Sequence, residues 1–177
     1  MQVPPNDTPQ RDAATADQPP AQRADWTIDQ GWAQYTAAEH AVWKTLFQRQ
    51  TRLLPGRACD AFLQGMRALP IVADQIPDFA QLSEVLARRT GWQVVAVPGL
   101  VPDEVFFDHL AHRRFPAGQF IRKPSELDYL EEPDVFHDLF GHVPMLMNPA
   151  LADYIQAYGE GGLRAQRLGC LDLLARV

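Results

Sequence analysis

Two histidines stand five positions apart in a segment that also carries carboxylates. His137 and His142 are accompanied by Asp134, Asp138 and Gly141. Neutral imidazoles are common metal ligands, and two of them with one carboxylate form the facial triad that suits iron(II). The spacing differs from the His-Glu-x-x-His pattern of zinc proteases, whose histidines lie one helical turn apart. The segment is therefore a candidate non-haem iron site, and a zinc hydrolase is disfavoured.

The five-residue spacing places a condition on the backbone. On an ideal α-helix, two residues five apart point about 140° away from each other. Gly141 would allow the chain to leave the helix and bring both rings to one side. Asp134 is expected to orient an imidazole through a hydrogen bond, and Asp138 to face the open part of the site. Alone, such a histidine pair is more often structural, and the two aspartates also fit an acidic first helical turn.

The elements that must position these residues are mainly helices with a few short strands. Thr36 and Glu39 form a capping box ahead of apolar residues at helical spacing. Residues 92–97 are rich in valine and are followed by Pro98-Gly99, which predicts a strand, and residues 119–122 are expected to be extended. Further helices are expected at about 57–69, 79–90, 102–114 and 133–140, with two more beginning near 149 and 171.

Composition narrows the class of protein. The chain has 177 residues, 46% hydrophobic and 21% charged, which is typical of one globular domain. The net charge of −6, without a basic stripe, argues against nucleic acid as a partner. Arg113 and Arg114 are interpreted as a solvated helix end. No run of 18 apolar residues is present, so no membrane partner is expected.

Two further features concern the ends of the chain and its compartment. Residues 1–25 are polar and rich in proline, so a disordered tail is expected there, followed by one domain at 26–177. Cys59 and Cys170 are too few for a disulfide framework and are expected to be reduced core thiols. The expected location is the cytoplasm.

Residues 122–144 resemble the iron-binding segment of the biopterin-dependent aromatic amino-acid hydroxylases. Residues 133–144 read Pro-Asp-x-x-His-Asp-x-x-Gly-His-Val-Pro, a pattern whose two histidines bind iron in that family. Other stretches resemble the bacterial, single-domain members that act on phenylalanine; they are 53–59, 94–107, 113–116 and 152–159. The resemblance implies that family's catalytic-domain fold. It also implies hydroxylation of L-phenylalanine to L-tyrosine with O₂, a tetrahydropterin and iron(II), in phenylalanine catabolism.

The resemblance also implies roles for individual residues. His137 and His142 would be the metal ligands, and Asp138 would lie beside the pterin within the catalytic centre. Arg122 would pair with the carboxylate of the amino-acid substrate, for which its fork of donors is suited. Leu130 stands where the animal enzymes have a threonine near the substrate. The pterin ring would be held by Gly99, Leu100, Val101 and Phe106.

The family's third iron ligand is a glutamate that would lie beyond Val177. Glu160 is expected in a glycine-rich turn and is not assigned that role. The chain is therefore expected to be the N-terminal part of the catalytic domain, incomplete at its C-terminus, and inactive alone. The full-length protein is expected to be a monomer. Two alternatives remain open: a tyrosine or tryptophan hydroxylase of the same family, and a non-catalytic helical interaction domain.

Overall fold

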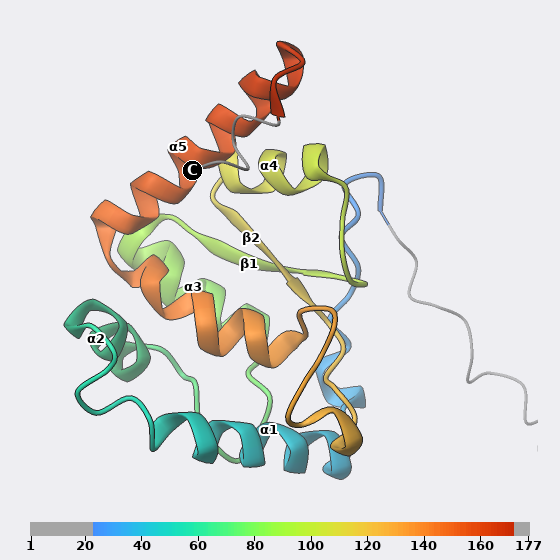
Figure 1. Ribbon diagram of the computed structural model, residues 1–177, viewed down its shortest axis with the longest axis vertical. Helices are drawn as coiled ribbons and strands as arrows, with labels where there is room; N and C mark the ends of the chain where they lie inside the picture. Colours follow the sequence, from blue (N-terminus) through green and yellow to red (C-terminus); the bar gives the residue numbers. More distant parts are fainter. Residues whose placement is uncertain (1–22, 172–177) are drawn as a thin grey trace, which may run out of the picture.

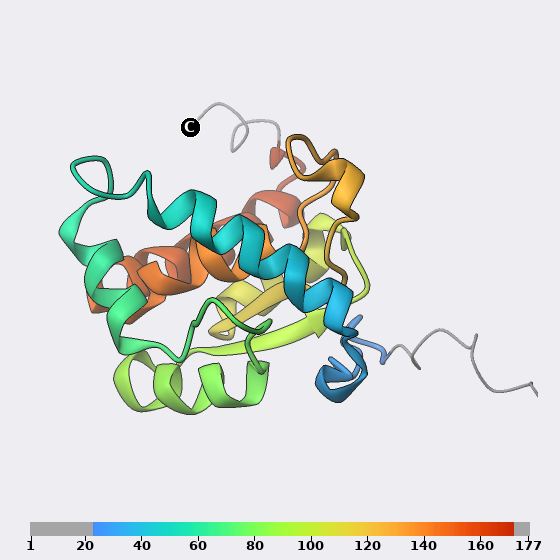
Figure 2. The same cartoon turned by 90° about the horizontal axis from the view of Figure 1, so that it is seen from below.

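The computed structural model describes residues 23–171, and it is mainly helical around two short strands (Figures 1 and 2). This confirms the predicted fold class. Most of the expected tail and nearly all of the expected last helix, residues 1–22 and 172–177, lie outside the described residues. The elements, in order, are η1 (Trp32–Gln34), α1 (Ala37–Thr51), α2 (Asp60–Ala68), α3 (Phe79–Thr90), β1 (Gln93–Val97), α4 (Asp103–Ala111), β2 (Arg114–Gly118), η2 (Pro124–Glu126), η3 (His137–His142), η4 (Val143–Met147) and α5 (Pro149–Arg167).

The two strands form a parallel pair connected through α4. Gln93 lies opposite Arg114, and Val97 lies opposite Gly118. A parallel pair needs a crossover connection, and α4 supplies it. Consequently both strands end at the same edge of the sheet, where a ligand site is commonly built in α/β units. α3 packs against β1, and α4 packs against both β2 and α5 (Figure 1).

β2 was not predicted, because its sequence suggests another structure. The expected helix 102–114 ends at Ala111, and Arg113 adopts a left-handed conformation with φ of 54°. This turn starts the strand at Arg114, ahead of the expected extended piece. Pro116 lies within this strand opposite Val95, and proline is tolerated where one edge of a strand is unpaired. Among the described residues, β2 pairs only with β1.

The interpretation of Arg113 and Arg114 as a solvated helix end was wrong. Arg113 Nε donates to Gln156 Oε1 at 2.7 Å, and its guanidinium also contacts Asp153 on α5. Arg114 donates to Asp108 at 3.0 Å and to Asp25 at 3.3 Å. The two arginines therefore join β2 to α4, to α5 and to the N-terminal segment.

Three smaller expectations also need correction. Cys59 is exposed at the start of α2, and Cys170 is half-buried, so neither is a core thiol. Glu160 lies inside α5, because the surrounding glycines are accommodated within a continuous helix. Arg23 and Asp25, placed in the expected tail, contact the folded part of the chain.

The core fills the space between the sheet and the surrounding helices. Its fully buried side chains come from several elements, and they include Trp43, Leu82, Leu86, Trp92 and Leu139. The Trp43 indole N–H donates to the Val72 carbonyl at 2.8 Å, which satisfies its polar atom. None of the helices between residues 23 and 171 is long and apolar enough to cross a membrane.

The capping box of α1 gives a first testable prediction. The Thr36 hydroxyl accepts from the Glu39 N–H at 3.3 Å, and Glu39 Oε2 accepts from the Thr36 N–H at 2.7 Å. Thr36→Ala removes one of these two contacts. We expect the free energy of unfolding to fall by about 1 kcal/mol. Urea denaturation measures this loss, and Thr45→Ala, in the exposed middle of the same helix, is the control; equal losses in both would refute a capping effect.

A buried histidine on α4 predicts how stability depends on pH. His109 is fully buried and donates from Nε2 to the Asp25 carbonyl at 2.9 Å. Burial lowers the pKa of His109 below its ordinary value of 6.5, although the hydrogen bond to Asp25 acts in the opposite direction. The unfolded chain therefore binds this proton more readily than the folded chain.

This difference fixes the sign of the pH effect. The contribution of His109 to stability is fully present above pH 6.5 and is lost as pH falls from 6.5 toward its folded-state pKa. We expect His109→Gln to show a smaller loss of unfolding free energy than the parent between pH 7 and pH 5. Identical pH profiles for the two proteins, by urea denaturation, would contradict this prediction.

Candidate metal centre

The two candidate ligands lie at the ends of a π-helix. η3 runs from His137 to His142, and the Val143 N–H donates to the Asp138 carbonyl five residues earlier. Residues five apart therefore lie on successive turns of one face, whereas an α-helix would separate them. Such i→i+5 turns are rare and often mark functional sites. The expected α-helix at 133–140 is thus largely replaced by this turn.

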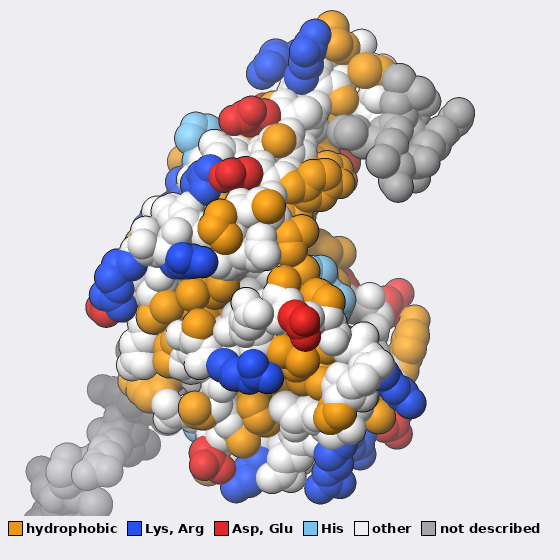
Figure 3. Space-filling model, turned by 90° about the vertical axis from the view of Figure 1, so that its left-hand side faces the viewer, with side chains coloured by type: hydrophobic (Ala, Val, Ile, Leu, Met, Phe, Trp, Pro, Cys, Tyr) orange, Lys and Arg blue, Asp and Glu red, His pale blue; other side chains and the backbone are white. Residues whose placement is uncertain are grey.

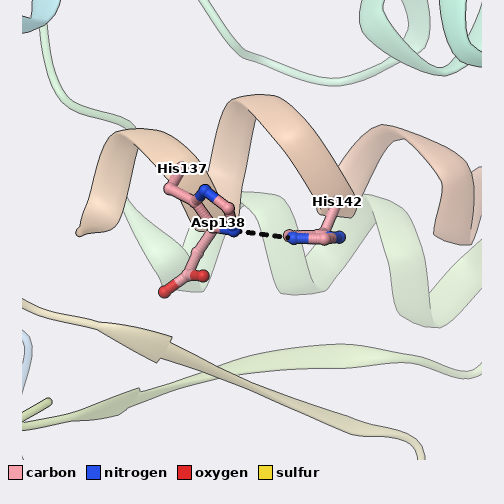
Figure 4. A group of neighbouring side chains, drawn as sticks. All are labelled: His137, Asp138 and His142. Atoms are coloured by element: carbon pink, nitrogen blue, oxygen red, sulfur yellow. Dashed lines mark hydrogen bonds between the residues drawn. The ribbon is translucent and has the colours of Figure 1, made fainter. Parts of the chain in front are cut away.

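The proposed break at Gly141 was wrong, although the convergence of the rings was predicted. Gly141 does not have a positive φ, and the helical backbone continues through it. The widened turn itself brings the rings together. His137 Nε2 and His142 Nε2 lie 3.0 Å apart (Figure 4). Two nitrogens, each about 2.1 Å from one metal ion, are separated by this distance when they subtend roughly 90°. The pair therefore fits two adjacent positions of an octahedral site.

A lowered pKa favours the neutral form of the His142 imidazole, which is the form that binds metal. Neighbouring groups partly desolvate the exposed His142 side chain, which lowers its pKa below the ordinary 6.5, and a charge on His137 would lower it further. The His142 ring packs on Phe115, with ring centres 5.9 Å apart. A neutral imidazole has the free lone pair that coordination needs.

Asp138 is the one carboxylate that joins the two histidines in a compact group within residues 23–171. Its oxygen and the two ring nitrogens lie within 4.8 Å of one another. Asp138 Oδ2 accepts from the Gly118 N–H at 2.8 Å, and Figure 4 shows the carboxylate turned toward the strands. Burial raises the pKa of Asp138 to about 7, against the effect of that hydrogen bond. Asp138 therefore faces a neighbouring cavity rather than the line between the imidazoles.

Asp134 does not orient an imidazole directly, which corrects its expected contact. It is fully buried and accepts from the His137 backbone N–H at 3.0 Å. Arg122 donates to its two oxygens from Nε at 2.8 Å and from Nη2 at 2.9 Å. Burial would raise the pKa of Asp134, but these hydrogen bonds outweigh it and lower the pKa. Asp134 thus fixes Arg122 and the first residue of the π-helix.

The residues expected to hold a pterin line one cavity at the carboxyl ends of the strands. This cavity of 230 Å³ contains all of the expected pterin residues together with Asp138. Gly118, Pro116 and Asp103 also line it and were missed, the first two because β2 was not predicted. Asp103 stands in the acidic first turn of α4, and residue spacing does not relate that turn to a cavity. Its lining includes Gly99, Leu100, Val101, Phe106, Gly118 and Asp138.

Two further openings are lined by His137. A groove of 360 Å³ is lined by Arg122, Leu130 and His137. A larger groove of 580 Å³ also includes Arg122 and His137, with Phe136 and Phe140 in its wall. Figure 3 shows a hollowed surface on one side of the molecule, with hydrophobic side chains around it and a histidine visible at its edge. His137 therefore lines both grooves, while the next residue, Asp138, lines the strand-end cavity.

The fold and the histidine pair define a candidate metal centre, and comparison of the sequence with known families shows the class of protein that carries it. Residues 11–169 match the family described as biopterin-dependent aromatic amino acid hydroxylase. The chain belongs to this family. Its histidine pair, its parallel strands and the cavity at their ends are thus features of a family member.

Among individual relatives, the chain is similar to phenylalanine-4-hydroxylases. It is 69% identical over 159 residues to that of Caulobacter vibrioides, covering 90% of this chain and 54% of the relative. A crystal structure of Chromobacterium violaceum phenylalanine hydroxylase, with bound iron(III) and 7,8-dihydrobiopterin, matches with a TM-score of 0.84 and 58% identity over 88% of this chain and 57% of that one. The iron- and phenylalanine-bound structure of that enzyme matches with a TM-score of 0.81 and 57% identity, covering 86% and 55%. The chain spans about half the length of the curated relatives it matches.

Proposed function

We propose that this chain forms the iron-binding and pterin-binding part of a phenylalanine 4-monooxygenase. One observation carries the proposal: two imidazole nitrogens approach to 3.0 Å on a turn whose His137 lines a groove with a fixed arginine and whose Asp138 lines the strand-end cavity. The relatives that bind iron, dihydrobiopterin and phenylalanine support it. The reaction would convert L-phenylalanine to L-tyrosine with O₂ in the cytoplasm, and the full-length protein would be a monomer.

His137 and His142 would hold the ferrous ion. Bound there, iron(II) supplies the redox chemistry that links dioxygen to the electrons of the reduced pterin. The protein's own contribution is placement. The π-helix keeps the two ring nitrogens on one side, and the Asp134 carboxylate holds the start of this turn through the His137 N–H.

The pterin would lie in the strand-end cavity. Phe106 offers a ring face, while Gly99, Leu100 and Val101 form the wall beside it. Asp138 closes the cavity toward the histidines and stays fixed by the Gly118 N–H. With a pKa of about 7, Asp138 is able both to accept a hydrogen bond from the pterin and to hold a proton near the metal.

The amino-acid substrate would occupy the groove on the Arg122 side. Arg122 uses Nε and Nη2 for Asp134, which leaves Nη1 outside that pair for a substrate carboxylate. The bidentate pair fixes the plane of the guanidinium before substrate arrives, and this reduces the entropy lost on binding. Leu130 in the same groove offers an apolar contact in place of a hydroxyl.

The proposal is tested by loading the 177-residue chain with metal and pterin. We expect one Co(II) ion per chain, a visible absorption band that reports nitrogen ligands, and quenching of tryptophan fluorescence by 7,8-dihydrobiopterin. Absence of both signals in a folded sample would refute the proposed function.

The same sample should form no tyrosine when supplied with iron(II), tetrahydrobiopterin, O₂ and phenylalanine. The reason is that the curated relatives are about twice as long, and we infer that a further carboxylate ligand comes from the part not covered here. Asp138, the carboxylate beside the histidines, is already engaged by Gly118. Chromatographic detection of tyrosine is the measurement, and iron-dependent turnover would show that this chain is sufficient.

A further inference from the structure

We infer that Gly65 on α2 is a positioning residue for the metal ligands, an inference that rests on the proposed iron site. α2 crosses the segment that follows His142 at very short range. A β-carbon on Gly65 would lie 2.0 Å from the carbonyl oxygen of Pro144, 2.7 Å from its carbonyl carbon and 3.0 Å from its Cα. All three atoms belong to backbone, so no side-chain rotation would relieve the overlap.

Pro144 is only two residues beyond the ligand His142. It belongs to η4, the 3-10 turn that continues the π-helix without a break. A shift of Pro144 is therefore transmitted directly to the last turn of η3. Since the His137 and His142 nitrogens are 3.0 Å apart, a displacement of about 1 Å would spoil a shared coordination site.

The turn is also held by contacts other than those with α2. Val143, Pro144 and Leu146 are buried. On the other side of the turn, the Thr90 hydroxyl of α3 donates to the Leu146 carbonyl at 2.9 Å. η4 is therefore held between α2 and α3, and a larger residue at position 65 pushes it against a fixed neighbour.

If α2 moved outward instead, a second contact with the π-helix would be lost. Phe62 lies one turn before Gly65 on α2, and its ring centre is 6.1 Å from that of Phe140. Phe140 is buried within η3, between the two histidines in sequence. Both possible responses to a side chain at position 65 therefore disturb the ligand-bearing turn, which makes close approach at Gly65 a requirement of the site.

The test compares Gly65→Ala, which would overlap the Pro144 backbone, with glycine-to-alanine substitutions that lie away from the metal ligands. In Gly65→Ala we expect the Kd for Co(II) to rise by about tenfold or more, the range seen when groups that orient metal ligands are removed. We also expect the Co(II) absorption band to change in shape, because one imidazole would be tilted away. Alanine is the better helix former, so a loss in this variant would come from the overlap rather than from helix propensity.

Two other glycines on α5 provide matched controls. A β-carbon at Gly159 would lie 2.5 Å from the Ala111 backbone nitrogen, on a helix pair that carries no metal ligand, so Gly159→Ala should lower stability and leave the Kd for Co(II) unchanged. A β-carbon at Gly161 would have no neighbour within 4 Å, so Gly161→Ala should neither lower stability nor raise the Kd for Co(II). A Gly65→Ala variant that loses stability but keeps the parent's affinity and spectrum would overturn the positioning role.

A second variant covers the case in which Gly65→Ala does not fold. Phe62→Leu creates no overlap but weakens the contact of α2 with Phe140. We expect its Kd for Co(II) to rise by a few-fold, and an unchanged Kd would overturn the inference. If the parent chain binds no Co(II), the proposed function fails. If the parent binds Co(II) and both variants bind it with the same Kd, only the role of Gly65 fails.

Discussion

Replacing His142 with alanine is expected to raise the Kd for Co(II) by about 100-fold or more. Removing a group that merely orients a ligand costs about 10- to 100-fold in affinity, and here a ligand itself is removed. The two nitrogens are 3.0 Å apart, so a single ion engages both, and the variant leaves only His137. Calorimetric or spectroscopic titration of the 177-residue chain gives the two constants.

His112→Ala is the control for this experiment. His112 is exposed at the end of α4, with its side chain 62% accessible, and contacts Asp108 rather than the π-helix. We expect its Kd for Co(II) to equal that of the parent. Because the ring of His142 is exposed, the unfolding free energy of His142→Ala should stay close to the parent value. Retention of tight Co(II) binding by this variant would exclude the histidine pair as the metal site.

Replacing Asp134 with alanine is expected to lower the unfolding free energy by about 3–5 kcal/mol. Asp134 is completely buried and Arg122 is 13% accessible, so the variant leaves a guanidinium without its partner. The backbone N–H groups of Arg122 and His137 also lose their acceptor. Urea denaturation measures the loss, and a weakened affinity for Co(II) should accompany it.

Two companion variants separate this mechanism from a general cost of removing an aspartate. Asp128→Ala breaks the pair with Arg49, in which Asp128 is 95% accessible, and should cost at most about 1 kcal/mol. Replacing both members of the buried pair, as Arg122→Met with Asp134→Leu, should recover much of the stability lost in Asp134→Ala. Equal losses for Asp134→Ala and Asp128→Ala would contradict the assigned role of the buried pair.

Local signals in the sequence predicted most helices well. Thr36, Asp78 and Asn148 begin α1, α3 and α5 as expected, because a side-chain cap acts within a few residues. β2 was missed because its formation depends on pairing with β1 and on the left-handed turn at Arg113. Neither a strand partner nor a positive φ at arginine can be read from residue spacing.

The sequence predicted which residues form the candidate metal site but not how they are arranged. The family pattern indicated His137 and His142, whose convergence the structure shows, while the predicted break at Gly141 was replaced by a π-helix. The hydrogen bonds of Asp134 involve residues up to 12 positions away and a backbone N–H, which no motif specifies. The contact between Gly65 and Pro144 is equally invisible in the sequence, since it depends on how two helical segments cross.

The crossover that links β1 to β2 has a consequence for the order in which the molecule assembles. β1 pairs with β2 only after the connection through α4 has brought the two strands together. Closing this connection costs conformational entropy before any contact between the strands compensates for it. The strand-end cavity has walls from both sides of this connection, so it exists only once that late event is complete. A small molecule that fills it therefore selects the finished chain over earlier intermediates and shifts the folding equilibrium by mass action.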